Sequence, residues 1–121
     1  MTREFSRTNR VASQIQRELA VLICEELKDP RLGMITVQEV RVARDLSHAK
    51  VYVTVIGGDL DEAGSVKRLN GAAGFLRSML ARRVKLRTVP ELHFVFDESI
   101  ERGTRLTSLI EQAVGKDVTK H

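Results

Sequence analysis

The sequence predicts an α+β fold in which helices cover one face of a small mixed sheet. Apolar residues repeat at helical spacing over residues 8–28, which indicates a long amphipathic helix. Two segments rich in β-branched residues follow at 35–42 and 49–56, and a third alternating segment lies at 92–96 after a further helical stretch. This order of helix, two strands, helical pair and strand is typical of a helix layer on one sheet.

Length and composition limit the number of domains. The chain has 121 residues, 42% of them hydrophobic, which is enough for one modest core. We therefore expect a single domain over residues 1–121, with a core of about residues 8–114 and short terminal tails. No segment approaches the roughly 20 apolar residues of a membrane span, and no secretory signal pattern is present, so we expect a cytoplasmic protein with no membrane partner.

The first predicted helix is bounded by local signals. Thr8 or Asn9 can cap its start, and Asp29 followed by Pro30 ends it. The single cysteine, Cys24, lies in an apolar run of this helix, so we expect it to be buried. The residues that form the apolar stripe are Val11, Ile15, Leu19, Leu22, Ile23 and Leu27.

The next two segments predict a long hairpin. Residues 35–42 alternate, but the apolar parity changes between Val37 and Val40, which predicts a bulge or bend near Gln38. A turn at 44–47 then leads into the β-branched strand at 49–56, which two glycines close.

A pair of helices should follow the hairpin. Acidic residues at 59–62 favour a helix start, and the sequence Gly-Ala-Ala-Gly at 71–74 interrupts the helix, because glycine costs about 1 kcal/mol in a helix interior. A second helix at 75–84 leads through an extended segment to the last strand, and Ser99 can cap a final helix. The apolar residues expected to face the core are Phe75, Leu76, Met79 and Leu80 in the second helix, and Leu106, Leu109, Ile110 and Ala113 in the final one.

Positive charge is concentrated in residues 67–87. This segment carries seven Lys or Arg residues and no acid, whereas the whole chain has a formal net charge of +4, so the rest of the chain sums to −3. A localised excess favours a polyanion such as RNA over a merely solvated helix face. Because aromatic residues are few, recognition should depend on phosphate, sugar and shape more than on stacked bases.

The sequence shows no apparatus for catalysis or metal binding. His48, His93 and His121 stand alone, without the paired Cys or His spacing of a zinc motif, so we expect no metal. No serine-nucleophile motif or phosphate-binding loop occurs. We therefore expect a protein that is not an enzyme and needs no cofactor.

Four groups of residues resemble the bacterial ribosome-binding factor A family. They are Lys-Asp-Pro-Arg-Leu-Gly at 28–33, Arg-Asp-Leu at 44–46, Ala-Lys-Val-Tyr-Val at 49–53 and Val-Pro-Glu-Leu-His-Phe at 89–94. Their order and spacing, over almost the whole chain, make the match specific. The resemblance implies a type II KH-like domain with helices on a three-stranded mixed sheet. It also implies an assembly factor that binds the small (30S) ribosomal subunit and its 16S rRNA late in maturation, assists processing of the rRNA 5′ end and supports growth in the cold.

The interruption at 71–74 matches two patterns. In RNA-binding KH domains a GXXG loop clamps the backbone of about four nucleotides. The assembly-factor family replaces this loop by a kink of the form Ala-X-Gly, which Ala72, Ala73 and Gly74 match. We favour the interhelical kink, because the central alanines lack the cation that often accompanies a phosphate-gripping loop. We also expect close backbone approach at Gly74, so that a bulky residue there would strain the fold.

We expect the protein to contact rRNA through cations that neutralise phosphates and position the domain. The candidate RNA-binding residues are Arg77, Arg82, Arg83, Lys85 and Arg87 in the basic segment, Arg3, Arg7 and Arg10 near the start of the chain, and Arg44 in the hairpin turn. Ribosomal proteins and an assembly GTPase are further candidate partners, and we expect a monomer. Two alternatives stay open: a general single-stranded RNA binder of the KH type, and a protein-interaction subunit whose basic face meets an acidic protein.

Overall fold

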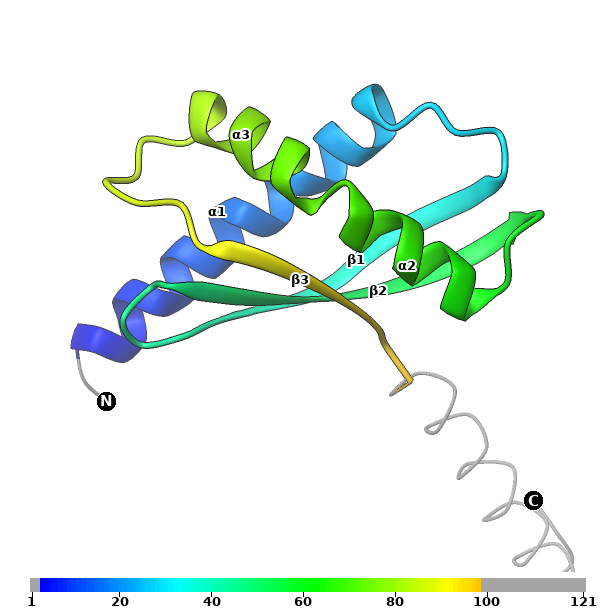
Figure 1. Cartoon of the computed structure of the whole chain (residues 1–121). Coiled ribbons are helices and arrows are strands. Elements are labelled where there is room, and N and C mark those ends of the chain that lie inside the picture. Colours follow the sequence, from blue (N-terminus) through cyan, green and yellow to red (C-terminus); the bar gives the residue numbers. More distant parts are fainter. Residues whose placement is uncertain (1–2, 99–121) are drawn as a thin grey trace, which may run out of the picture.

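The computed structural model describes residues 3–98, with side chains from residue 7 onward (Figure 1). The predicted order of a helix, two strands, two helices and a strand is confirmed, whereas the helix expected from Ser99 lies outside the described residues. The elements are α1 (Arg3–Glu26), β1 (Leu32–Val42), β2 (His48–Gly58), α2 (Glu62–Gly71), α3 (Ala73–Arg83) and β3 (Glu91–Phe96). None of the helices within this part of the chain is long and apolar enough to cross a membrane.

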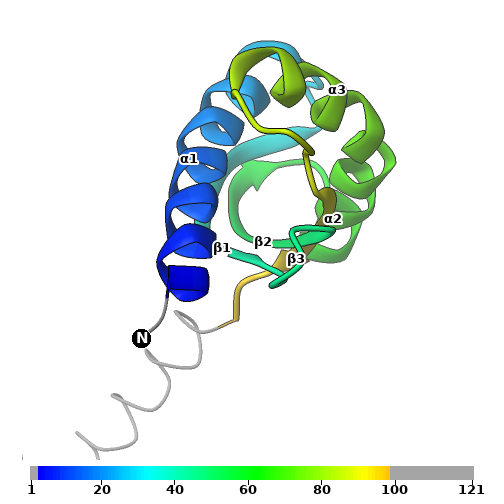
Figure 2. The same ribbon diagram turned by 90° about the vertical axis from the view of Figure 1, so that its left-hand side faces the viewer.

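The three strands form one mixed sheet with β2 at its centre. β1 and β2 pair antiparallel as the predicted hairpin, and β3 pairs parallel with β2 on the other side. The helices cover one face of this sheet, with α1 over β1 and the α2–α3 pair over the β3 side (Figures 1 and 2). The predicted α+β class, the three-stranded mixed sheet and the KH-like order of elements are thus confirmed.

The hydrophobic core fills the space between the helices and the sheet. Each helix contributes fully buried side chains at helical spacing, and the central strand contributes alternate valines, because only one face of the sheet is covered. The largest fully buried apolar side chains are Ile15, Leu19, Leu22, Leu69, Leu76, Leu80, Val51 and Val53.

The bulge expected near Gln38 is present. The pairing register of β1 against β2 shifts between Val37 and Glu39, so that Gln38 is the extra residue. This shift lets both Val37 and Val40, which are three residues apart, point into the core. The Gln16 side chain of α1 donates from Nε2 to the carbonyl oxygens of Val37 (3.2 Å) and Gln38 (3.3 Å), which gives partners to backbone groups at the bulge.

The loop after α1 is held by Asp29. Its carboxylate accepts hydrogen bonds from Arg31 Nε (3.1 Å), Arg31 Nη2 (2.9 Å) and Arg68 Nε of α2 (2.8 Å). The side-chain and backbone hydrogen bonds from Arg31, followed by the hydrogen bond from Arg68, hold the pKa of Asp29 well below its usual range. The sequence around Asp29 therefore has a structural use: it joins the end of α1, the start of β1 and α2.

A second polar contact secures β3, which is an edge strand. The Asn70 side chain of α2 donates from Nδ2 to the Phe94 carbonyl (3.0 Å) and accepts at Oδ1 from the Phe94 N–H (2.8 Å). An edge strand leaves a row of backbone N–H and C=O groups without a ladder partner, and Asn70 binds one of each. Asn70 thus fixes the position of α2 along β3.

Three local expectations are wrong. α1 begins at Arg3, so Thr8 and Asn9 lie inside the helix. No Gly or Pro interrupts residues 3–7, and a residue that favours an N-cap does not prevent a helix from starting earlier. Cys24 is exposed, because the neighbouring Ile23 occupies the edge of the buried stripe and the next residue turns away from it. Phe75 is 49% exposed, since Leu76 and Leu80 form the buried stripe of α3.

Candidate nucleic-acid interface

The acid-free segment 67–87 covers the end of α2, all of α3 and most of the loop that leads to β3. Its cations do not form one continuous surface. Lys67 and Arg68 lie on α2, and Arg68 is paired with Asp29 at 2.8 Å. The others lie along α3 and the following loop, toward the opposite end of the molecule (Figure 1).

Two of the predicted RNA-binding residues make contacts within the fold. Arg77 donates from Nε and Nη2 to the carbonyl oxygen of Val89, at 2.9 and 2.8 Å, and so ties α3 to the loop before β3. Arg83 donates from Nε to Glu18 Oε1 of α1 at 2.6 Å, and this hydrogen bond raises the pKa of Arg83. Both guanidinium groups therefore have structural partners, which sequence patterns do not reveal.

Arg44 also has an interaction partner in the protein, whereas five other predicted cations remain available for a ligand. Arg82, Lys85 and Arg87 are exposed and have no hydrogen bond or ion pair to any residue among 7–98, the range whose side chains the structure describes. The same is true of Arg7 and Arg10 on the first turns of α1. Arg3 belongs to α1, but its side chain is not among those described.

These cations belong to elements that meet at one end of the domain. The start of α1 lies beside the end of β1 and the hairpin turn, since Thr8, Asn9, Arg41 and Arg44 are among the residues that line a cleft of about 460 Å³ between them. The loop that follows α3 reaches the same turn, where the Glu91 N–H donates to the Ser47 carbonyl at 2.9 Å. Figure 2 faces this end directly.

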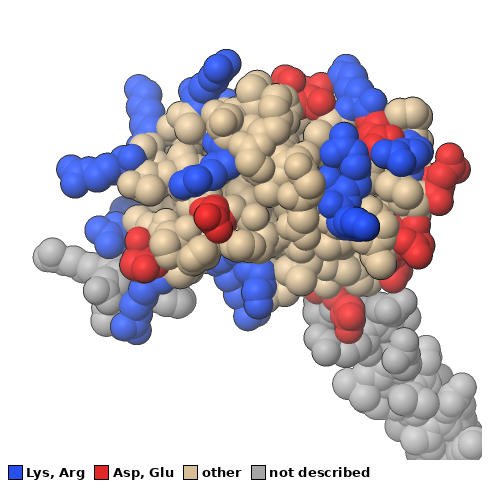
Figure 3. All heavy atoms as spheres, in the orientation of Figure 1, with Lys and Arg blue, Asp and Glu red and all other residues tan. Residues whose placement is uncertain are grey.

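We name this surface the basic end. Figure 3 shows Lys and Arg side chains projecting over the left-hand end of the molecule with few acids among them, whereas acids are more frequent at the right-hand end. A surface dominated by one sign of charge attracts a polyanion at longer range than a mixed surface does. The basic end consists of Arg7, Arg10, Arg44, Arg82, Lys85 and Arg87.

A single residue, Ala72, separates α2 from α3. Its N–H donates to the Arg68 and Leu69 carbonyls (3.2 and 3.0 Å), and its carbonyl accepts from the Leu76 N–H at 2.9 Å. Helical hydrogen bonding therefore continues on both sides of the break, and the Ala72 side chain is buried against the core. This is the geometry of two helices meeting at a kink. It offers no open loop in which the N–H of Ala72 could hold a phosphate.

The space around Gly74 differs from our expectation of close backbone approach. A Cβ added at Gly74 would meet no heavy atom of the described residues within 4 Å, and its φ is not positive. Gly74 lies in the first turn of α3, where an ordinary side chain can point to solvent. The expectation that a larger residue would strain the kink is therefore wrong.

We instead expect Gly74→Ala to raise stability by about 0.4 to 1 kcal/mol, because alanine loses less backbone entropy in a helix. Urea denaturation followed by circular dichroism measures this change. Gly57→Ala is a matched control: Gly57 also has no neighbour within 4 Å, but its φ is +76°, so the same substitution should destabilise there. A loss of stability in Gly74→Ala would show that α3 cannot accept a side chain at this position.

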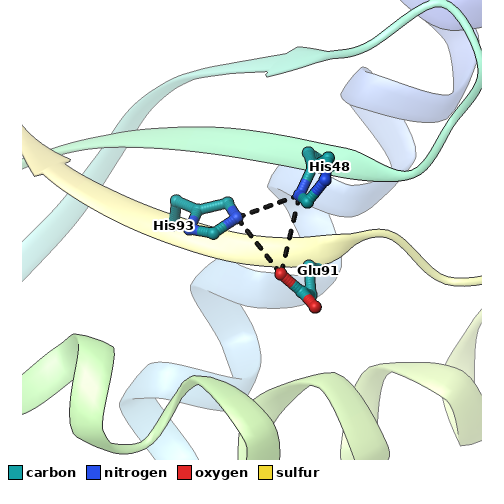
Figure 4. A group of neighbouring side chains, drawn as sticks. All are labelled: His48, Glu91 and His93. Atoms are coloured by element: carbon teal, nitrogen blue, oxygen red, sulfur yellow. Dashed lines mark hydrogen bonds and ion pairs between the residues drawn. The ribbon is translucent and has the colours of Figure 1, made fainter.

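Two of the three histidines do not stand alone. The parallel pairing of β2 with β3 brings His48, Glu91 and His93 together on the exposed face of the sheet (Figure 4). No local spacing signals this cluster, because Glu91 and His93 follow His48 by 43 and 45 residues and meet it only through the strand register.

Comparison with known proteins agrees with this architecture. A family model described as ribosome-binding factor A matches residues 7–110. Ribosome-binding factor A of Stutzerimonas stutzeri (strain A1501) is 58% identical over 120 residues, which cover 97% of this chain and 93% of that protein. The crystal structure of ribosome-binding factor A from Thermus thermophilus is 38% identical with a TM-score of 0.65, over 73% of this chain and 93% of that chain.

A further solved structure concerns a complex. It is a homology model of Thermus thermophilus ribosome-binding factor A fitted into a cryo-EM map of its complex with the 30S subunit. This structure is 38% identical with a TM-score of 0.60, over 72% of this chain and 91% of that chain. The family model spans most of the sequence and the relatives match almost their full length, so the chain belongs to the ribosome-binding factor A family.

Proposed function

We propose that this protein is an assembly factor that binds the small ribosomal subunit and its 16S rRNA through the basic end. The observation that carries the proposal is its 58% identity to a ribosome-binding factor A over nearly the full length of both chains. The Thermus thermophilus relative that was fitted into a map of a 30S complex supports the choice of ribosomal subunit.

The mode of binding follows from the surface chemistry. Exposed guanidinium and ammonium groups at the basic end neutralise phosphates and orient the domain on folded rRNA. Aromatic surfaces on which bases could stack are few among residues 7–98. Phe94 is buried, and the Tyr52 ring is covered by the Arg41 guanidinium at 5.4 Å from its centre. Phe75 is the one phenylalanine or tyrosine side chain in this range that is exposed. Recognition then depends on the shape of a preformed rRNA site.

The kink supports the same view. A KH clamp needs backbone groups that open toward the nucleic acid, whereas Ala72 is buried and its N–H is already bonded within the helices. We therefore expect this domain to bind short unstructured RNA poorly. This observation favours a ribosome-docking factor over a general single-stranded RNA binder.

We further propose that the protein acts as one domain over residues 1–121, as a monomer in the cytoplasm and without catalysis. Assistance in maturation of the rRNA 5′ end and support of growth in the cold belong to the same proposal. Their physical basis would be the stabilisation of one rRNA conformation by the bound domain.

Competition binding tests the proposal. Fluorescently labelled full-length protein is titrated with purified 30S subunits, and then with 30S subunits in the presence of excess single-stranded oligonucleotides. We expect saturable binding to 30S, no comparable binding to 50S subunits, and little competition by the oligonucleotides. Equal affinity for oligonucleotides would favour a KH-type single-stranded RNA binder. Binding to subunit proteins but not to 16S rRNA would favour a protein-interaction module.

A further inference from the structure

We propose that His48, Glu91 and His93 form a binding site for a divalent transition-metal ion of the Zn²⁺ class. The proposal goes beyond ribosome binding and does not depend on it. It also departs from the expectation, drawn from sequence spacing, that the protein has no metal site.

The strand register creates the cluster. His48 is the first residue of β2 and lies directly opposite Glu91, the first residue of β3. Glu91 and His93 are two residues apart on one strand, so their side chains share a face. The intervening Leu92 and its partner Ala49 are buried under the helices, which leaves the three polar side chains on the open face of the sheet.

The ligand atoms have the spacing of a metal site. His48 Nδ1 and His93 Nε2 are 3.1 Å apart, and Glu91 Oε1 lies 3.6 Å from His48 Nδ1 and 3.5 Å from His93 Nε2. Zn²⁺ bonds to imidazole nitrogen and carboxylate oxygen measure about 2.0 to 2.2 Å, so the corners of a tetrahedral site lie about 3.3 to 3.5 Å apart. An octahedral site with the same bonds would bring neighbouring ligands to about 3.0 Å. The observed triangle fits three corners of a tetrahedron better.

The orientation of the side chains fits as well. Figure 4 shows both imidazole rings and the carboxylate pointing toward a common point, with the ligand atoms nearest one another. Two imidazoles and one carboxylate are a ligand set that Zn²⁺ accepts, with the fourth position left for water. The three side chains are between 54% and 57% exposed, so an ion can enter from solvent.

A metal ion bound at this site would cross-link two strands of the sheet. A bound ion would join the start of β2 to the start of β3, two segments that the α2–α3 connection separates in sequence. Lys50, which pairs with His93 in the register, places a positive charge nearby and should keep the affinity moderate. Ion binding to the folded state alone would raise its stability by mass action.

Isothermal titration calorimetry of the full-length protein with Zn²⁺ tests the site. We expect one ion per chain. His48→Ala and His93→Ala should each weaken binding by at least about tenfold, since even the loss of a residue that only supports a ligand costs 10- to 100-fold. Cys24→Ser and His121→Ala are matched controls, because they remove the single thiol and the third imidazole of the chain, neither of which belongs to the cluster. Both variants should bind Zn²⁺ like the parent.

Thermal melting gives a second readout. Zn²⁺ should raise the melting temperature of the parent protein and of both control variants, but not of His93→Ala. All three cluster side chains are exposed, so their replacement leaves the core intact, and circular dichroism of the metal-free variants verifies this. Equal Zn²⁺ affinity in the parent and the His48→Ala/His93→Ala double variant, or no binding by the parent, would overturn the proposal.

Discussion

Reversing two cations of the basic end, Lys85→Glu together with Arg87→Glu, is expected to weaken binding to the small ribosomal subunit by more than about tenfold without unfolding the domain. Both side chains are exposed, have no partner among residues 7–98, and lie in the loop after α3 rather than in a helix. Their replacement removes phosphate contacts and adds repulsion, while the buried neighbours Val84 and Val89 stay in place.

Salt dependence makes the reason for the loss measurable. Each neutralised phosphate contributes about 0.7 to 0.9 to the magnitude of the slope of log affinity against log salt, so the double variant should lose about 1.4 to 1.8 of that slope. Fluorescence anisotropy with labelled protein and 30S subunits, at several potassium chloride concentrations, provides both values.

A control variant with the same change in net charge separates local contact from general repulsion. Lys28→Glu with Lys67→Glu reverses two cations, one near the loop after α1 and one on α2, at the end where acids and cations are mixed (Figure 3). We expect this variant to keep most of its affinity. If both variants lose the same affinity, the basic end is not the contact surface and net charge alone explains the effect.

Gly33→Ala is expected to cause a large loss of stability, because the added Cβ would collide with the backbone of the paired strand. A Cβ at Gly33 would lie well inside 3.0 Å of the carbonyl oxygens of Ile56 and Gly57 on β2. These are backbone atoms held by the β1–β2 ladder, so they cannot move aside as a flexible side chain can. We expect a loss of about 3 kcal/mol, which corresponds to a fall of about 10 to 20 °C in melting temperature.

The matched control for this loss is Gly71→Ala. Gly71 ends α2, and a Cβ there would meet no heavy atom within 4 Å in the part of the chain that the structure describes. Differential scanning calorimetry of both variants compares the two positions. A melting temperature of Gly33→Ala within a few degrees of the parent would mean that the two strands can separate at this point, contrary to the packing described.

The local pattern of the sequence determined most of the elements. The change of parity between Val37 and Val40 predicts the bulge at Gln38, because side chains alternate strictly along a strand and both valines must reach the core. The apolar stripe of α1 and the β-branched run of β2 are equally local signals. The match to the family then depends on motifs that can be read directly from the chain.

The tertiary structure alone decided which charged and polar groups are available. Arg77 and Arg83 look like Arg82 in the sequence, but only the packing of α3 against α1 and the loop before β3 gives them partners. The free space at Gly74 and the obstruction at Gly33 are likewise invisible to composition, because each depends on which backbone lies opposite.

The histidine cluster has the same origin. His48 and His93 are separated by 45 residues, and they meet because β3 enters the sheet parallel to β2 in one register. That register is set by the long α2–α3 crossover and by its contacts, such as Asn70 with Phe94. Periodicity determines which way a side chain points along its own strand, whereas only the packing of distant segments determines what it points at.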